Sequence, residues 1–244
     1  MQFRNSLLTL FAMDLTNGMP SDPSKIRYLG VAYHINDAGN IATCAHIVRG
    51  VKDGETLVAT EFYGECMTFR VNDIRCHEKY DFAVCHVSRQ KYEVIPIHGK
   101  REIELGTDVL SYGFTSNGVS DGRYITMPRL FKGHIVRVHD SPILPDARST
   151  CEISYPSHNG FSGTPVLFNA PKTALAGMLF SNYESTITLH KFAEVEDSGT
   201  KFSEEIHKVV ELGIAHTAFD VRCFLRDLGI SRVALDTPQP DELP

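Results

Sequence analysis

The sequence predicts an all-β protein of barrel or sandwich architecture with a helix near its C-terminus. Short runs rich in apolar and β-branched residues recur along the chain, separated by turn signals, and no helical pattern stands between them. With 244 residues, one all-β unit of two barrels is as consistent with the length as two independent domains. We place the boundary in the polar segment 96–105. Residues 1–100 then form the first barrel, residues 101–232 the second barrel with the helix, and residues 233–244 a disordered tail.

The expected strands follow the apolar runs in chain order. The first two runs are separated by a loop containing Asn17, Gly18, Pro20 and Pro23, and residues 36–40 have the composition of a hairpin turn. The runs predict strands at 5–13, 28–36, 56–62, 65–75, 83–87, 108–114, 123–127, 131–138, 151–155, 164–168 and 174–181.

Two segments of the last fifth of the chain have apolar residues at helical spacing. The segment 203–212 predicts one short helix that ends at Gly213. The segment 220–229 predicts a better one, because Asp220 can accept from the free amides of the first turn, apolar residues share one face, and Gly229 suits a left-handed stop.

Charge and composition exclude several classes of partner. The net charge is −6 and no cluster of Lys and Arg is longer than a pair, so we expect no nucleic acid partner. The apolar stretch 6–13 is too short to cross a bilayer and lacks a cleavage site, which predicts neither a membrane partner nor a signal peptide. Neither glycine-rich pattern for binding phosphates occurs, so we expect no nucleotide cofactor.

The six cysteines lack the spacing of a disulfide framework. Cys44, Cys85 and Cys223 lie inside apolar runs, so we expect buried thiols and a reducing, cytoplasmic location. No Cys-x-x-Cys or His-x-x-x-His pair occurs, and we therefore expect no metal.

Three segments carry residues for nucleophilic chemistry. Residues 159–166 read Asn-Gly-Phe-Ser-Gly-Thr-Pro-Val, which places Ser162 between two glycines just before an apolar run. A serine hydroxyl attacks a carbonyl only when a base removes its proton and donors receive the charge on oxygen. His46 lies at the end of a β-type run, 41–48, and Asp81 stands at the head of another. Taken singly, each has an ordinary interpretation as a turn, strand-end or surface residue.

Together these segments resemble the trypsin-like serine peptidases of chymotrypsin fold, and the bacterial HtrA/Deg branch more closely than the digestive enzymes. Three segments carry the resemblance most specifically. They are residues 28–48, which end in Ala-His-Ile-Val, residues 81–84, which read Asp-Phe-Ala-Val, and residues 160–166. Weaker similarity extends it over roughly residues 28–225. The resemblance implies two six-stranded antiparallel β-barrels and a C-terminal helix, without the PDZ domain that many relatives carry.

The resemblance also implies the chemistry. Ser162 attacks a peptide carbonyl to form an acyl-enzyme, His46 accepts its proton and later returns it to the leaving amine, and Asp81 orients the imidazole. The amides of Gly160 and Ser162 form the oxyanion hole. The expected activity is that of a serine endopeptidase acting on a protein or peptide substrate, with no cofactor and no metal.

Two positions depart from the family pattern, which usually has Asp or Asn just before the serine and Gly two residues after it. Here these positions hold Phe161 and Thr164. Phe161 argues against activation by a newly cut N-terminus, and the β-branched Thr164 restricts the backbone of the loop. Two alternatives follow: a catalytically silent binding module that keeps the fold, and an inducible protease that an activating protein partner or ligand switches on.

Specificity rests on the resemblance as well. In the family, residues shortly before the serine and in the strand after it wall the primary pocket. No acidic residue occurs in these stretches, so we expect a small or apolar side chain before the cut rather than Lys or Arg. The corresponding residues are Tyr155, Pro156, Ser157, His158, Asn159, Phe180, Ser181 and Asn182.

Overall fold

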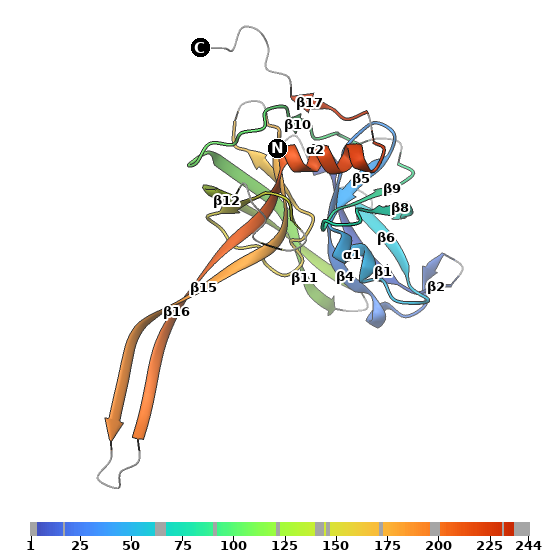
Figure 1. The fold of residues 1–244 in the computed structure, drawn as a ribbon. Helices are drawn as coiled ribbons and strands as arrows, with labels where there is room; N and C mark the ends of the chain where they lie inside the picture. Colours follow the sequence, from blue (N-terminus) through green and yellow to red (C-terminus); the bar gives the residue numbers. More distant parts are fainter. Residues whose placement is uncertain are drawn as a thin grey trace.

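The computed structural model confirms an all-β protein with a C-terminal helix, built from two curled sheets that lie side by side (Figure 1). It describes residues 4–16, 18–61, 67–89, 92–120, 123–139, 144, 147–170, 173–195, 201–230 and 232–236. Of the tail expected to be disordered, residues 233–244, the structure describes 233–236, in which residues 235 and 236 form a short strand, and residues 237–244 lie outside the described ranges.

The first sheet has seven strands in the order β7-β6-β1-β4-β5-β9-β8. Its central pairs are antiparallel: β1 pairs with β4 on one side and with β6 on the other. Its strands are β1 (Leu7–Met13), β4 (Arg27–His34), β5 (Asn40–Thr43), β6 (Thr56–Glu61), β7 (Thr68–Arg70), β8 (Asn72–Cys76) and β9 (Ala83–His86). A separate hairpin, β2 (Leu15–Thr16) with β3 (Met19–Pro20), follows β1, and short 3-10 turns occur at η1 (Arg4–Ser6) and η2 (Pro23–Lys25).

The second sheet has eight strands in the order β14-β11-β12-β13-β16-β15-β10-β17, and it curls because β14 also pairs with β15. Most of its pairs are antiparallel, whereas β10 runs parallel to both of its neighbours. Its strands are β10 (Ile97–His98), β11 (Asp108–Ser120), β12 (Arg123–His139), β13 (Thr150–Ile153), β14 (Pro165–Phe168), β15 (Leu175–Val195), β16 (Lys201–Thr217) and β17 (Leu235–Asp236).

Helix α2 (Ala218–Asp227) follows β16 and packs its apolar face into the main core. The helix begins earlier than the sequence predicts, because Thr217 is the residue whose side chain accepts from the amide of Asp220. The Asp220 carboxylate instead accepts from the amide of Ser149 at 3.0 Å, which ties the loop before β13 to the helix.

The predicted helix at 203–212 is wrong, because this segment is part of β16. It pairs with β15 residue by residue, for example Thr186 with Val209, and the two strands form an arm that projects far from the barrels (Figure 1). A cross-strand ion pair joins Lys191 to Glu205 at 2.5 Å. The β-branched residues of the segment satisfy strand geometry equally well, and the pairing partner decides between the two structures.

Other boundaries differ in smaller ways. The two strands expected at 123–127 and 131–138 form the single strand β12, and the run 65–75 divides into β7 and β8. Residues 40–43 form β5, after which the chain turns into the short helix α1 (Ala45–Arg49) instead of continuing the β-type run. The thiols expected to be buried, Cys44, Cys85 and Cys223, are buried.

One large apolar cluster joins the two sheets, and a second fills the barrel of the second sheet. Among the described residues, no helix has the length and apolar character needed to cross a membrane.

Candidate active site

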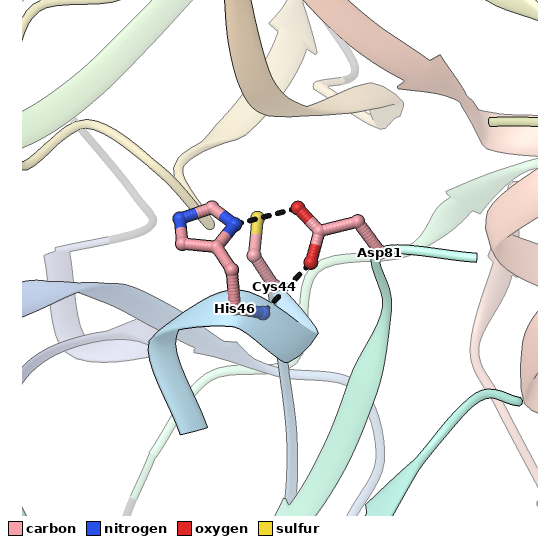
Figure 2. A group of neighbouring side chains, drawn as sticks. All are labelled: Cys44, His46 and Asp81. Carbon is pink, nitrogen blue, oxygen red and sulfur yellow. Dashed lines mark hydrogen bonds and ion pairs between the residues drawn. The ribbon is translucent and has the colours of Figure 1, made fainter. Parts of the chain in front are cut away.

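His46 and Asp81 are brought together in the first sheet. His46 lies on α1, directly after β5, and Asp81 lies two residues before β9, the strand that pairs with β5. The His46 ring nitrogen Nδ1 is 2.6 Å from Asp81 Oδ2, and the His46 amide donates to Asp81 Oδ1 at 2.8 Å (Figure 2). The carboxylate is buried, with 6% of the side chain exposed, whereas the imidazole is 48% exposed. The Nδ1 contact orients the ring, and the amide contact holds the backbone of His46 against Asp81.

The electrostatics of Asp81 favour the carboxylate. Burial raises its pKa, but the hydrogen bonds and charge of His46 outweigh that effect, so the net pKa of Asp81 is lowered. Asp81 is therefore ionised at neutral pH and accepts the Nδ1 proton of His46, which directs the Nε2 lone pair away from Asp81.

Ser162 lies on a tight turn between β13 and β14. The amide of Thr164 donates to the carbonyl of Phe161 at 3.0 Å, and Gly163 in the third position has a φ of +82°. A positive φ at this position defines a type II turn and favours glycine. A side chain at Gly163 would also meet the carbonyl oxygen of Val31 at 2.0 Å, so the turn packs directly against the first sheet.

Backbone contacts bring the serine turn to the histidine segment. The carbonyl of Leu179 accepts from the amide of Gly163 at 2.8 Å and from the thiol of Cys44, two residues before His46, at 3.4 Å. The carbonyl of Ser162 accepts from the amide of Val31 at 2.9 Å. No hydrogen bond joins the Ser162 hydroxyl to His46 within the described chain. Such bonds are often long before substrate binds and tighten in the complex.

The two amides expected in the oxyanion hole flank Phe161. Gly160 has a φ of +89° in a second turn, closed by the amide of Phe161 donating to His158 at 2.8 Å. Within the described ranges, the amides of Gly160 and Ser162 donate to no protein group. An oxyanion hole requires N–H groups that no protein acceptor occupies.

The two positions that depart from the family pattern are both buried. Phe161 is fully buried and packs against Phe131 with 5.2 Å between ring centroids, inside the second barrel. Thr164 is also fully buried. Both side chains lie against Gly113, where an added Cβ would be 2.7 Å from the Thr164 hydroxyl oxygen. The loop therefore accommodates both residues through apolar packing and a facing glycine.

Two residues that sequence reasoning missed support the site. The Tyr28 hydroxyl lies 2.8 Å from the carbonyl oxygen of Gly160, and its ring fills the space where a side chain at Gly160 would be. His216 lies behind Asp81, with Nε2 3.2 Å from its carbonyl oxygen. Each pair is more than 130 residues apart in sequence. No local pattern links such distant residues.

The predicted pocket residues come together only in part. The side-chain oxygen of Asn182 accepts from the amide of Ser157 at 3.0 Å, which joins the two stretches. Tyr155 points into the second barrel and contacts the Ser111 hydroxyl at 2.7 Å. Phe180 points the other way and stacks on His216, so its side chain lies apart from Tyr155. Of the remaining members, His158 and Asn159 are exposed, and Pro156 and Ser181 are half-buried.

One group in the described chain has the donor types of a metal site. The ligand atoms of Cys44, His46 and Asp81 lie within 4.8 Å of one another (Figure 2). The closest of these contacts is already the hydrogen bond between Nδ1 and the carboxylate, and the Cys44 thiol donates to a carbonyl. The arrangement is satisfied by its own hydrogen bonds and gives no reason to place an ion there.

Comparison with known proteins agrees with this geometry. Residues 30–178 match the family model described as a trypsin-like peptidase domain. No curated protein matches the chain in a sequence search. Among solved structures, the HtrA-type protease AlgW with a decapeptide has a TM-score of 0.64 at 14% identity, covering 93% of this chain and 66% of AlgW. The Rv3671c protease from M. tuberculosis, in its active form, has a TM-score of 0.57 at 16% identity, covering 95% and 84%. At such identities the likeness establishes the fold alone.

Proposed function

This chain belongs to the trypsin-like peptidase family, and from that premise we propose that it is a serine endopeptidase with Ser162, His46 and Asp81 as its catalytic residues. One observation carries the assignment. His46 is held by two hydrogen bonds to a buried, ionised Asp81, while Leu179 ties the preceding Cys44 to the turn that presents Ser162. This arrangement supports proton transfer between the Ser162 hydroxyl and the His46 imidazole, which come from different sheets.

In the proposed mechanism, His46 Nε2 accepts the Ser162 proton as the Ser162 oxygen bonds to the substrate carbonyl carbon. Asp81 holds Nδ1–H and stabilises the imidazolium that forms. The amides of Gly160 and Ser162 receive the negative charge on the carbonyl oxygen. The imidazolium then protonates the leaving amine, which leaves an acyl-enzyme, and a water molecule activated by His46 hydrolyses it.

The proposed substrate is an extended peptide. Strand β15 pairs with β14 only as far as Met178, and beyond Leu179 its edge beside the Ser162 turn is unpaired in the described chain. An extended peptide can add to such an edge as a further strand, which would bring its carbonyl groups to Ser162. Because the pocket stretches carry no acidic residue, we propose a small or apolar residue before the cut. A cleavage library in which Lys or Arg dominates would overturn this preference.

Labelling with a fluorophosphonate tests the central assignment. The reagent should modify Ser162, and the Ser162→Ala variant should lose turnover by about 10⁶ while remaining folded. Ser185→Ala, on the exposed arm, is the matched control and should be labelled like the parent protein. Retained peptide hydrolysis by purified Ser162→Ala would refute the proposed role of Ser162 as the nucleophile.

The alternative function is a catalytically silent binding module. Phe161 and Thr164 motivate it, because both depart from the family pattern in the loop that carries the nucleophile. This alternative predicts no labelling of Ser162 under any condition. Labelling that occurs only when a partner protein or ligand is present would instead support an inducible protease.

A further inference from the structure

A large cavity lies on the outer face of the first sheet, outside the candidate active site. Its volume is about 900 Å³. Side chains alternate along β1 and β6, so that Leu10 and Leu57 point into the main core while Phe11 and its partner Val58 point outward. The outer face is therefore also apolar, and it requires cover from another element.

The described part of the chain covers this face only in part. The hairpin β2–β3 and the following segment lie over the face, and strand β12 of the second sheet closes one side with Ile125 and Thr126. The cavity between these elements has mostly apolar walls, and Met19 at its border is 70% exposed. A concave apolar space of this size is typical of a site for a small ligand. The apolar lining residues are Phe11, Met13, Leu15, Met19, Pro20, Ile26, Val58 and Ile125.

The charged residues of the lining favour an anionic group. Among the described lining residues, only Glu61 and Arg70 carry charge, and Glu61 forms an ion pair with Arg89. Arg70 has no ion pair within the described part of the chain, and its neighbour on the cavity wall is the hydroxyl-bearing Thr68. A guanidinium without a partner beside a hydroxyl can bind a carboxylate.

We propose that this cavity binds an amphipathic monocarboxylate, an apolar chain that ends in one carboxylate, and that binding stabilises the loop at Gly160. The apolar chain lies along Phe11 and Met13, and the carboxylate meets Arg70. The second half of the proposal rests on the proposed peptidase function, whereas the binding site does not.

Tyr28 links the cavity to the loop. Its ring packs on Phe11 with 5.5 Å between centroids, in the same small cluster as Met13 and Val58. On its other side the Tyr28 hydroxyl lies 2.8 Å from the Gly160 carbonyl oxygen and 3.0 Å from that of Phe114. A ligand that packs on Phe11 restricts the Tyr28 ring and, through it, the peptide that follows Gly160. Restricting this peptide keeps the neighbouring oxyanion amides in place.

Binding is tested with two sources of the same chemistry, myristate and an acetylated apolar tripeptide with a free C-terminal carboxylate. Calorimetric titration should give saturable, one-site binding of at least one of them. Arg70→Gln should weaken that binding about fivefold, as expected for one exposed ion pair, and should not change the binding of neutral tetradecanol. Arg226→Gln, on the exposed face of α2, is the matched control and should bind like the parent. Failure of both carboxylates to saturate, or binding that Arg70→Gln leaves unchanged, would overturn the site.

The link to the active site is tested by the rate of fluorophosphonate labelling at Ser162. Saturating ligand should raise that rate about fivefold or more. Tyr28→Phe should still bind the ligand but lose the increase, because the hydroxyl contact to Gly160 is gone. Binding without any change in the labelling rate would overturn the link. If the ligand binds and Ser162 is never labelled, with or without it, the proposed function fails while the binding site stands.

Discussion

His216 supports the peptide that carries Asp81: its Nε2 lies 3.2 Å from the Asp81 carbonyl oxygen. A carbonyl oxygen only accepts, so the proton is on Nε2, and Nδ1 has no hydrogen-bond partner in the described chain. The ring is fully buried and stacks on Phe180 with 4.0 Å between centroids. His216 therefore fixes Asp81 from behind, while His46 contacts its carboxylate from the front.

Removing the His216 donor should reduce activity more than stability. We expect His216→Leu to lower the labelling rate of Ser162 about tenfold, because Asp81 loses a positioning contact and a displaced carboxylate orients His46 less well. His216→Gln keeps an N–H donor of similar reach and should retain a larger part of the rate. Thermal unfolding of both variants is the control. Equal labelling rates for the two variants at equal stability would show that the hydrogen bond has no positioning role.

The stability of the fold should fall between pH 6.5 and pH 5. Burial lowers the pKa of His216 to about 4, and burial, followed by the charge of Arg89, lowers that of His34 to about 3. In this window the unfolded chain binds protons at both positions and the native protein does not, so protonation favours unfolding. Each histidine contributes a slope approaching about 1.4 kcal/mol per pH unit.

Urea unfolding at several pH values measures this slope. The His216→Gln and His34→Gln variants should each show a shallower dependence on pH than the parent. A free energy of unfolding that stays constant, or rises, from pH 7 to pH 5 would contradict the assignment of neutral, buried imidazoles.

Gly163 should tolerate no side chain, for two separable reasons. Its φ of +82° strains any other residue, and an added Cβ would lie 2.0 Å from the carbonyl oxygen of Val31. Gly106 is the matched control, with a φ of +79° and open space around it. Gly106→Ala should cost about 1–2 kcal/mol through backbone strain alone. Gly163→Ala should cost about 1–3 kcal/mol more through overpacking.

The labelling rate separates the two glycines further. Gly163→Ala displaces the turn that carries Ser162 from the first sheet and should reduce labelling strongly, whereas Gly106→Ala should leave it unchanged. Equal unfolding free energies for the two variants would mean that the serine turn is free to move away from Val31.

Local patterns predicted much of the fold, and the family resemblance supplied the candidate site residues. The resemblance places a histidine segment before an aspartate segment in the chain and implies that His46 contacts Asp81. The strands next to these residues, β5 and β9, pair as neighbours. The residues behind the site could not be found in this way. Tyr28 and His216 act on residues more than 130 positions away, and the shape that brings them there depends on the closure of both sheets.

The segment 203–212 shows the limit of periodicity. Ile206, Val209 and Val210 have helical spacing, yet all three are β-branched, and β15 offers them an antiparallel partner with one bulge opposite Ile206. In the strand, Ile206 and Val210 share one face and Val209 points to the other. The composition of the segment was the better guide, and its periodicity was misleading.

The arm formed by the outer parts of β15 and β16 should be the least stable part of either sheet. Beyond Asn182 and Gly213 its two strands pair only with each other in the described chain, and large side chains on it are exposed, including Leu189 at 60% and Ile206 at 53%. An isolated two-stranded ribbon is at best marginally stable in water. We expect its amides to exchange hydrogen far faster than those of residues 175–179, which β14 and β16 flank.

Exchange should be followed by mass spectrometry at two protein concentrations. Slow exchange in the arm at the lower concentration would contradict the prediction, and protection that grows with concentration would mean that a second copy covers its apolar side chains.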